Sequence, residues 1–351
     1  MIIIFLMIGG EKMDRAITVL ITGGAGFIGS NFVRYMLKKY PDYQVINLDK
    51  LTYAGNLANL TDIEDNLNYK FIKGDIINRE LVEHIFNEYE VNYVINFAAE
   101  SHVDRSIEEP DIFIKTNIMG TQVLLDIAKK YWLDKSEARN NRLEVNKFIQ
   151  ISTDEVYGSL GEDGYFTEDT PLAPNSPYSS SKTGADLVVR AYYKTFGLPV
   201  NITRCSNNYG PYQFPEKLIP FFLTNALHDK ELPLYGDGKN VRDWLHVKDH
   251  CRAIDLVLHE ASSGEIYNIG GNNEMTNLEI TETILRKLDK PNSLIKFVED
   301  RLGHDRRYAI DASKIKKELG WEPEYTFNGG IAETIEWYLN NQEWWQSLKN
   351  N

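Results

Sequence analysis

Short apolar segments alternate with amphipathic ones through the first half of the chain. The apolar segments predict strands at 16–22, 43–49, 69–75, 91–99 and 146–153, and 3.6-residue periodicity predicts helices at 28–40, 79–90 and 112–133. Strands that alternate with helices form βαβ units around a buried parallel sheet. The pattern therefore predicts an α/β fold with a Rossmann-type, doubly wound parallel sheet.

The pattern changes after residue 206. A helix is expected from Pro177 to about Phe196, followed by a sixth strand at 198–204. Pro and Gly then cluster in "NNYGPYQFPEKLIP" and "LPLYGDGKN", and the elements become shorter. We expect a first domain at 13–206 and a smaller C-terminal α/β lobe at 207–351, with 241–260 as a stretch that could pack back on the first domain. The terminal "EWWQSLK" is expected to form an amphipathic helix that packs on the body of the protein.

Composition narrows the class of protein. The chain has 351 residues, 42% of them hydrophobic, and a net charge of −13, which disfavours binding to nucleic acid or to an anionic membrane. The two cysteines, Cys205 and Cys251, do not suggest a disulfide scaffold and fit the cytoplasm. The opening "MIIIFLMIGG" has no basic segment before its apolar run and is too short to span a membrane. We interpret residues 1–12 as an N-terminal extension, with Met13 as the natural start.

A glycine-rich turn joins the first predicted strand to the first helix. "VLITGGAGFIGSNFV" contains Gly24-x-Gly26-x-x-Gly29 and equally Gly23-x-x-Gly26-x-x-Gly29. Such glycines allow the backbone to approach a pyrophosphate, and the helix N–H groups attract its charge. Asp49 ends the second strand, where an acidic residue binds ribose hydroxyls and repels a 2′-phosphate. The pattern predicts NAD rather than NADP, although the neighbouring Lys50 weakens the distinction.

Tyr178 and Lys182 form a Y-x-x-x-K pair on the helix that begins at Pro177. Residues four apart share a helix face, so the ammonium is expected to lower the pKa of the phenol. A phenolate can take a proton from a sugar hydroxyl while a nicotinamide is reduced. Together with the glycine turn, this pair resembles the extended short-chain dehydrogenase/reductases, which act largely on nucleotide sugars.

Five longer strings make the resemblance closer, and they span the chain from the second strand to the C-terminal lobe. They are similar to the dTDP-glucose 4,6-dehydratase family: "DKLTYAGNL" (49–57), "AAESHVDRS" (98–106), "STDEVYG" (152–158), "NNYGPYQFPEKLIP" (207–220) and "DRLGHDRRYAID" (300–311). Leu302 and Lys248 depart from the family pattern at positions without an expected chemical role. The resemblance implies conversion of dTDP-glucose to dTDP-4-keto-6-deoxyglucose by C4 oxidation, loss of water across C5 and C6, and reduction at C6.

The adjacent carboxylates in "STDEVYG" have separate tasks in that reaction. Tyr178 is the expected base at the C4 hydroxyl, Lys182 holds it, and Thr153 bonds the C4 oxygen. The resemblance implies that Asp154 is the acid at C6 and Glu155 the base at C5; the residues alone leave the order open. Residues 154 and 155 of a regular strand would face opposite sides, so we predict that the strand ends at or before Asp154 and that a turn directs both into one cleft.

The remaining contacts follow from the same strings. Asp75 could contact the adenine edge or be an ordinary loop residue, and Tyr235 could line the base pocket or be an ordinary loop tyrosine. The residues expected to contact NAD are Gly23, Gly26, Phe27, Ile28, Gly29, Asp49, Lys50, Leu51, Thr52, Asp75, Ile76, Ala98, Ala99, Ser101, Thr116, Tyr178, Lys182 and Asn208. Those expected to contact the substrate are Ser101, Thr153, Asn207, Lys217, Leu218, Pro233, Tyr235, Arg242, Asn277, Arg301 and His304.

Two further expectations and three alternatives complete the interpretation. His102 and His304 have no His or Cys at ligand spacing, so no metal is expected. The resemblance implies a homodimer formed through helices 112–133 and 177–196. The alternatives are a nucleotide-sugar 4-epimerase, a dehydratase for another nucleotide sugar and, outside enzymes, an NAD-sensing binding protein; the last would not need the five catalytic residues together.

Overall fold

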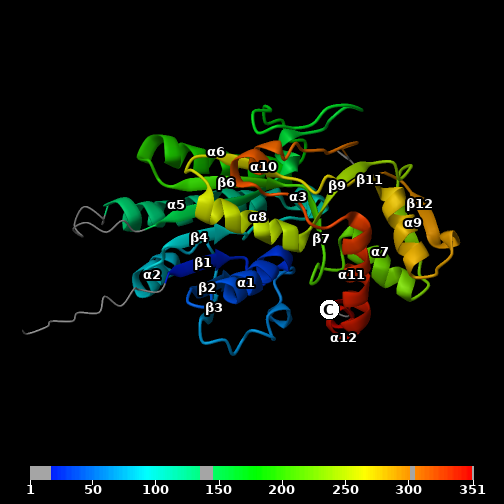
Figure 1. Ribbon diagram of the computed structural model, residues 1–351, viewed down its shortest axis with the longest axis horizontal. Coiled ribbons are helices and arrows are strands. Elements are labelled where there is room, and N and C mark those ends of the chain that lie inside the picture. Colours follow the sequence, from blue (N-terminus) through cyan, green and yellow to red (C-terminus); the bar gives the residue numbers. More distant parts are fainter. Residues whose placement is uncertain (1–16, 135–144, 301–304, 350–351) are drawn as a thin grey trace, which may run out of the picture.

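The computed structural model describes residues 17–134, 145–300 and 305–349. The expected N-terminal extension lies outside these residues. A seven-stranded sheet forms the centre of the larger layer of the protein (Figure 1). Its strands are β1 (Thr18–Thr22), β2 (Gln44–Asp49), β3 (Tyr69–Lys73), β4 (Tyr93–Asn96), β5 (Lys147–Thr153), β6 (Val200–Cys205) and β10 (Ile266–Ile269).

The sheet is parallel throughout, with the order β10-β6-β5-β4-β1-β2-β3. The order of the first six strands is that of a doubly wound dinucleotide-binding sheet, so the predicted fold class is confirmed. The chain order reverses between β1 and β4. In such sheets a crevice opens at this point beyond the carboxyl ends of the strands, and ligands bind there.

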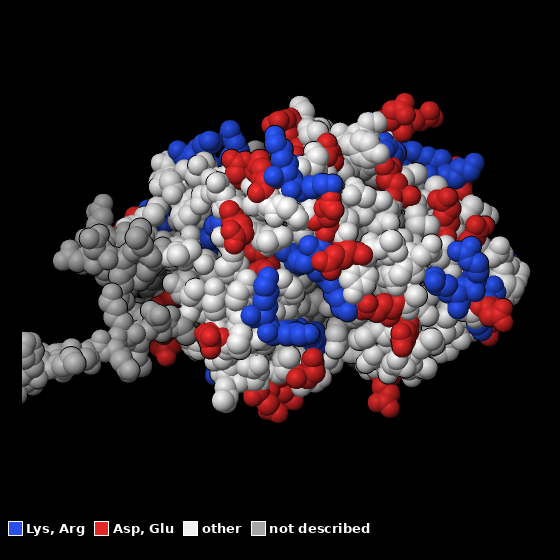
Figure 2. All heavy atoms as spheres, in the orientation of Figure 1, with Lys and Arg blue, Asp and Glu red and all other residues white. Residues whose placement is uncertain are grey.

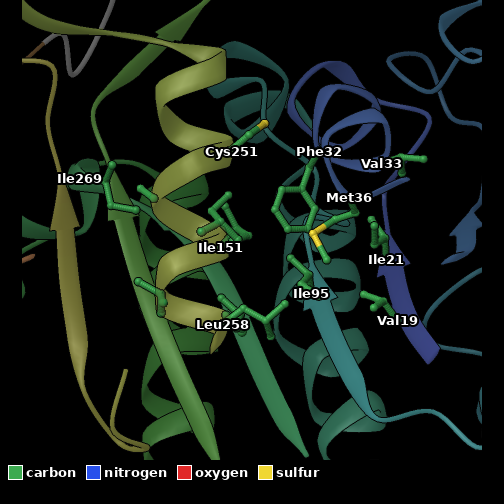
Figure 3. Packing of buried hydrophobic residues seen from close by; sticks show 14 of the residues in the cluster. Val19, Ile21, Phe32, Val33, Met36, Ile95, Ile151, Cys251, Leu258 and Ile269 are labelled. Atoms are coloured by element: carbon green, nitrogen blue, oxygen red, sulfur yellow. The ribbon is translucent and has the colours of Figure 1, made fainter. Parts of the chain in front are cut away.

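Helices cover both faces of the sheet because its strands are apolar on both sides. On one face, α1 (Phe27–Lys39) and α8 (Val247–Glu260) pack on the strands, with Phe32, Met36 and Leu258 among the buried side chains (Figure 3). The other face is covered by α2 (Arg79–Tyr89), α5 (Thr121–Lys129) and α6 (Pro177–Phe196). Thus α8, from the 241–260 stretch, and β10 both join the first layer although they follow residue 206.

The helix expected at 112–133 is not a regular α-helix. It is built from α4 (Pro110–Phe113), π-helical η2 (Ile114–Gly120), α5 and π-helical η3 (Lys130–Asp134). Within η2, the Asn117 side chain accepts from the Glu100 N–H at 2.9 Å and donates to Ser181 Oγ at 2.8 Å. These long-range bonds hold the wider turn, which periodicity along the sequence does not reveal. The expected strands and the helices at 28–40, 79–90 and 177–196 are present, with ends that differ by up to three residues.

The second lobe contains two small sheets and a helical layer with its own core (Figure 1). Its strands are β7 (Asn207–Tyr209), β9 (Val241–His246) and β11 (Glu274–Thr276) in one sheet, and β8 (Leu232–Tyr235) and β12 (Ile295–Val298) in the other. Its helices are α7 (Leu218–Leu227), α9 (Asn277–Lys287), α11 (Phe327–Asn340) and α12 (Gln342–Lys349). The expected terminal helix is α12, and its Trp345 side chain is buried.

The remaining helices are short and lie between the elements already described. They are η1 (Leu57–Asn59), α3 (Val103–Glu108), η5 (Asp154–Tyr157), η6 (Asn292–Leu294) and α10 (Ser313–Leu319). Among the described residues, no helix is long and apolar enough to cross a membrane. Cys205 and Cys251 are both buried with free thiols.

Candidate active site

A cavity of about 350 Å³ opens where the order of the strands reverses. It is lined by the ends of parallel strands on one side and by residues 205–217 on the other. Lys and Arg side chains lie close together near the middle of the face shown in Figure 2, between acidic ones. The expected residues that line the cavity are Gly23, Gly26, Phe27, Ile28, Gly29, Asp49, Lys50, Thr52, Asp75, Ile76, Ala98, Ala99, Ser101, Thr116, Thr153, Asp154, Glu155, Tyr178, Lys182, Asn207, Asn208 and Lys217.

The glycine turn brings the N-terminus of α1 to one end of this cavity. Gly23 has φ +70°, and a Cβ there would lie 2.7 Å from the Ala98 nitrogen, so the turn requires glycine. Gly26 is the N-cap of α1 and places no side chain over the first N–H groups; the first turn also has no acidic residue. These N–H groups and the helix dipole can therefore receive a phosphate.

Asp49 lies at the next strand end with its carboxylate held by the backbone. Its Oδ2 accepts from the Ala25 N–H at 2.9 Å and its Oδ1 from the Leu51 N–H at 2.8 Å. Burial raises the pKa of Asp49, and these two N–H groups act in the opposite direction. Lys50 forms an ion pair with Asp75 at 2.7 Å, so its charge is offset. The residues at this end fit an adenosine ribose with free hydroxyls better than one with a 2′-phosphate.

The turn with the adjacent carboxylates has the predicted geometry. Strand β5 ends at Thr153, and the 3₁₀ turn η5 begins at Asp154. The Thr153 Oγ1 accepts from the Glu155 N–H at 3.3 Å, which caps the turn. Asp154 and Glu155 both line the cavity together with Tyr178. The break in strand geometry thus directs both carboxylates into one cleft.

Asp154 is buried in an acidic environment. Its side chain is 2% exposed, and its Oδ2 has no hydrogen-bond partner among the described residues. Burial, with additional repulsion from Glu155 and Asp243, raises the pKa of Asp154 to about 8, although Arg242 acts in the opposite direction. Asp154 is therefore mainly protonated at neutral pH and can donate a proton.

Tyr178 and Lys182 share one face of α6 and are both buried, but the expected electrostatic effect of the lysine is not found. Burial and the charge of Glu155 raise the pKa of Tyr178 well above its ordinary value, and a hydrogen bond with Thr153 opposes this rise. Lys182 Nζ donates to the Ile151 carbonyl at 2.6 Å, and burial lowers its pKa. The ammonium is directed at the end of β5, and burial together with the negative charge of Glu155 has the larger effects on the pKa of the phenol.

A buried ion pair lies behind these residues. Arg204 Nε donates to Asp186 Oδ2 at 2.9 Å, with both side chains at most 3% exposed. Arg204 Nη1 also donates to the Tyr157 hydroxyl at 2.9 Å, and that hydroxyl donates to Asn268 Oδ1 at 2.8 Å. Since Asp186 is on α6 and Tyr157 on η5, the pair connects the helix of Lys182 to the turn of Asp154.

The other expected residues either do not line the cavity or lie outside the described residues. Arg242 is buried and donates to the carbonyls of Val241 and Asp305 at 2.7 and 2.9 Å. Leu51 is held at φ 58° beside Asp49 without lining the cavity. Leu218, Pro233, Tyr235 and Asn277 belong to the second lobe and do not line it. Arg301 and His304 lie outside the described residues, so their contacts stay predictions.

Several cavity residues were missed by the sequence analysis although they occur inside the strings that carry the resemblance. Glu100 is in "AAESHVDRS", and Gln213, Phe214 and Glu216 are in "NNYGPYQFPEKLIP". Ser152, Cys205 and Ser206 also line the cavity, next to residues that were identified. The strings therefore contained a signal, but only the folded chain shows which of their side chains face the cavity.

A parallel, doubly wound sheet with a glycine turn and a buried Tyr/Lys pair defines a Rossmann-type dehydrogenase/reductase. Comparison with known proteins narrows this class: the family model described as GDP-mannose 4,6 dehydratase matches residues 20–334. A dTDP-glucose 4,6-dehydratase of Xanthomonas campestris pv. campestris (strain B100) is 55% identical over 340 residues, covering 94% of this chain and 95% of the relative. The chain belongs to the dTDP-glucose 4,6-dehydratase family.

Two solved structures bear on the site. The dTDP-glucose 4,6-dehydratase from Bacillus anthracis str. Ames, in complex with NAD, is 58% identical, has a TM-score of 0.87 and covers 95% of this chain and 100% of its own. A UDP-glucose 4-epimerase from Thermotoga maritima with UDP-glucose is 30% identical, with a TM-score of 0.84 and coverage of 93% and 100%. The fold is thus common to dehydratases and epimerases, and the site residues must distinguish them.

Proposed function

We propose that this protein is a dTDP-glucose 4,6-dehydratase that converts dTDP-glucose to dTDP-4-keto-6-deoxyglucose. The observation that carries the proposal is the turn Thr153–Asp154–Glu155, which places a protonated and a second carboxyl group in the cavity that also holds Tyr178. Loss of water across C5 and C6 needs an acid at one carbon and a base at the other, whereas epimerisation at C4 needs neither. The paired carboxylates therefore favour a dehydratase.

NAD fits this site and would be held by the glycine turn, by the open N-terminus of α1 and by Asp49. When bound, NAD supplies the oxidation at C4 and the later reduction at C6. The protein residues have to bind the sugar and move its protons. The backbone-held Asp49 and the Lys50–Asp75 ion pair support NAD over NADP.

The proton transfers are assigned to four side chains. Tyr178, once ionised, takes the proton of the C4 hydroxyl as C4 is oxidised to a ketone, and Thr153 donates a hydrogen bond to the C4 oxygen. The ketone makes the C5 proton acidic. Glu155 removes that proton, Asp154 protonates the C6 hydroxyl as it leaves, and Glu155 returns a proton to C5 when C6 is reduced. Lys182 holds Tyr178 and the nicotinamide ribose, so its bond to the Ile151 carbonyl must exchange with cofactor contacts.

Burial supports this assignment of roles to the two carboxyl groups. Asp154 is the more enclosed of the pair, and its raised pKa keeps the proton that the leaving hydroxyl needs. Glu155 lies at the same cavity with greater exposure, as suits a base that is ionised before the reaction. Adjacent carboxyl groups titrate as a pair, so the proposal concerns the pair with one proton on Asp154.

We also propose the division of labour between the two parts of the chain. Residues 13–206 bind NAD, and residues 207–351 mainly bind the nucleotide sugar, with Asn207, Lys217, Leu218, Pro233, Tyr235, Arg242, Asn277, Arg301 and His304 as contacts. Lys217 supports this assignment because it lines the cavity from the second lobe, and its Nζ donates to the Ser101 carbonyl at 3.3 Å. Its ammonium can neutralise a diphosphate.

We propose that the protein is a homodimer and that it is located in the cytoplasm. Ile114, Met119 and Leu187 are between 45% and 53% exposed in the 112–133 segment and α6. These two segments pack on each other through α5 and α6, so a second copy placed there would form a four-helix contact. Sedimentation of the protein and of a Leu187→Asp variant tests the dimer: the variant should sediment as a monomer.

The reaction is tested by incubating the protein with dTDP-glucose and NAD in deuterated water. Dehydration predicts loss of one water and one solvent deuterium at C5 of the product. A product of unchanged mass with inverted C4 would assign the protein to the 4-epimerases, and turnover of another nucleotide sugar alone would change the substrate. Binding of NAD without any turnover would favour the NAD-sensing alternative.

A further inference from the structure

The C-terminal helix contacts the loop that follows β2, although 285 residues separate the two contacting side chains. The indole N–H of Trp344 on α12 donates to Asn59 Oδ1 at 2.8 Å. In Figure 1, α12 lies at the C-terminal end of the chain, below α11 and beside the layer that contains α1. The bond joins the second lobe to the part of the first domain that surrounds the glycine turn.

The side chain of Asn59 also forms a hydrogen bond with the glycine turn. Its side chain is 2% exposed, and its Nδ2 donates to the Ala25 carbonyl at 2.8 Å. Because Oδ1 accepts from Trp344 and Nδ2 donates to Ala25, the amide of Asn59 has one satisfactory orientation. The Asn56 N–H also donates to the Ala25 carbonyl, at 3.0 Å. The Ala25 carbonyl thus accepts two hydrogen bonds from residues outside the glycine turn.

The N–H of the same turn residue is also used. Ala25 donates to Asp49 Oδ2 at 2.9 Å, and Asp49 is the residue proposed to bind the adenosine ribose. Trp344, Asn59, Ala25 and Asp49 are therefore connected by three hydrogen bonds, with the backbone of Ala25 joining the second bond to the third. These bonds run from the C-terminal helix to two polar groups at the adenosine end of the cavity. The groups are the backbone of the glycine turn and the Asp49 carboxylate.

The same helical pair holds the opposite wall of the cavity. The Trp344 ring packs on Tyr212 and Trp337, with ring centroids 5.8 and 5.0 Å apart. The Tyr338 hydroxyl on α11 donates to the Gln213 carbonyl, and Gln213 lines the cavity. Displacement of α12 would therefore loosen the glycine turn and the facing loop at the same time.

We propose that Trp344 is a positioning residue for the cofactor, and that its hydrogen bond to Asn59 holds the glycine turn closed on bound NAD and slows NAD release. The inference rests on the proposed function, because it takes NAD as the occupant of this cavity. A dehydratase has to keep the cofactor through both oxidation and reduction on one sugar, so slow release serves the reaction. Trp344 does not line the cavity and would act through Asn59.

The test measures the rate constant for NAD release from the full-length protein. The protein is loaded with radiolabelled NAD, freed of excess, and chased with unlabelled NAD. Trp344→Phe keeps an aromatic ring and removes the N–H; release should become about fivefold faster, the equivalent of roughly 1 kcal/mol for one hydrogen bond. Trp337→Phe is the matched control, since it changes a tryptophan of the same cluster with no hydrogen bond found for its N–H among the described residues, and release should stay as in the unaltered protein.

Asn59→Ala extends the test to the acceptor of this hydrogen bond and leaves Trp344 in place. Release should again accelerate, and adding Trp344→Phe to Asn59→Ala should cause no further change, because the bond is already absent. Unaltered release from both single variants would overturn the inference, as would a full additional effect of Trp344→Phe in the Asn59→Ala background. If the unaltered protein bound no NAD at all, the proposed function itself would fail. That result differs from one in which the unaltered protein and the variants bind NAD and release it at the same rate.

Discussion

Replacing Asp154 with asparagine should abolish most activity and stabilise the protein at the same time. The amide matches the protonated carboxyl group in shape, but it is too weak an acid to protonate a leaving hydroxyl. Loss of a general acid lowers kcat by about 10²- to 10⁴-fold. Oxidation at C4 does not need this proton, so reduced nicotinamide should accumulate on the variant and be visible by absorbance.

The gain in stability follows from the raised pKa. Burial first, and then Glu155 and Asp243, raise the pKa of Asp154 from its ordinary 3.8 to about 8 in the folded state. Between these values the folded state holds a proton that the unfolded state has released, so the free energy of unfolding falls as pH rises. The slope is at most about 1.4 kcal/mol per pH unit, and it ends above pH 8, where both states are ionised.

Asparagine does not titrate, so the variant should lack this loss. Relative to the unaltered protein, Asp154→Asn should gain up to roughly 4 kcal/mol in its free energy of unfolding between pH 5 and pH 8. Chemical denaturation at several pH values measures the difference, and Asp163→Asn, which removes an exposed carboxylate, is the matched control. An identical pH dependence for Asp154→Asn and the unaltered protein would refute the protonated state of Asp154, and with it the assignment of the acid.

Three further changes test other parts of the site. Tyr178→Phe should lower kcat by about 10²- to 10⁴-fold while NAD still binds, because only the base at C4 is lost; turnover and NAD titration together check this. Arg204→Leu should destabilise the protein by about 3–5 kcal/mol in denaturant, since Asp186 stays buried without its partner, and a second change of Asp186→Leu should restore part of the loss. Gly29→Ala should cost about 1–3 kcal/mol of stability and weaken NAD binding, because its Cβ would overlap the backbone of the turn; Gly161→Ala, with open space around the site, should leave both unchanged.

Local patterns were the most reliable guide to this fold. The strands β1 to β6 and the helix from Pro177 to Phe196 follow from hydrophobic periodicity and from the residues that start and stop helices. The end of β5 at Thr153 was predictable too, because two carboxylates with roles in one cleft cannot continue a regular strand. The π-helical turns after Phe113 were not, since they depend on side-chain bonds to residues far along the chain.

The chemistry of the site was predictable in residue type but not in electrostatics. The Y-x-x-x-K spacing correctly placed Tyr178 and Lys182 on one helix face, yet the lysine is directed at the Ile151 carbonyl. The spacing between two residues does not determine which third group an ammonium contacts. Likewise, the expected substrate residues Arg242 and Asn277 do not line the described cavity, although the charge of Arg242 acts on Asp154, which does.

By itself, the sequence determined the glycine turn, the acid that ends β2, the adjacent carboxylates and the Tyr/Lys pair, because each depends on residues close together in the chain. Only the tertiary structure raises the pKa of Asp154, since the burial of Asp154 and the nearby Asp243 come from packing of distant segments. It also decided that α8 and β10 complete the first layer and that Trp344 reaches the glycine turn through Asn59. These features depend on long-range contacts and on burial, which the spacing of residues along the sequence does not reveal.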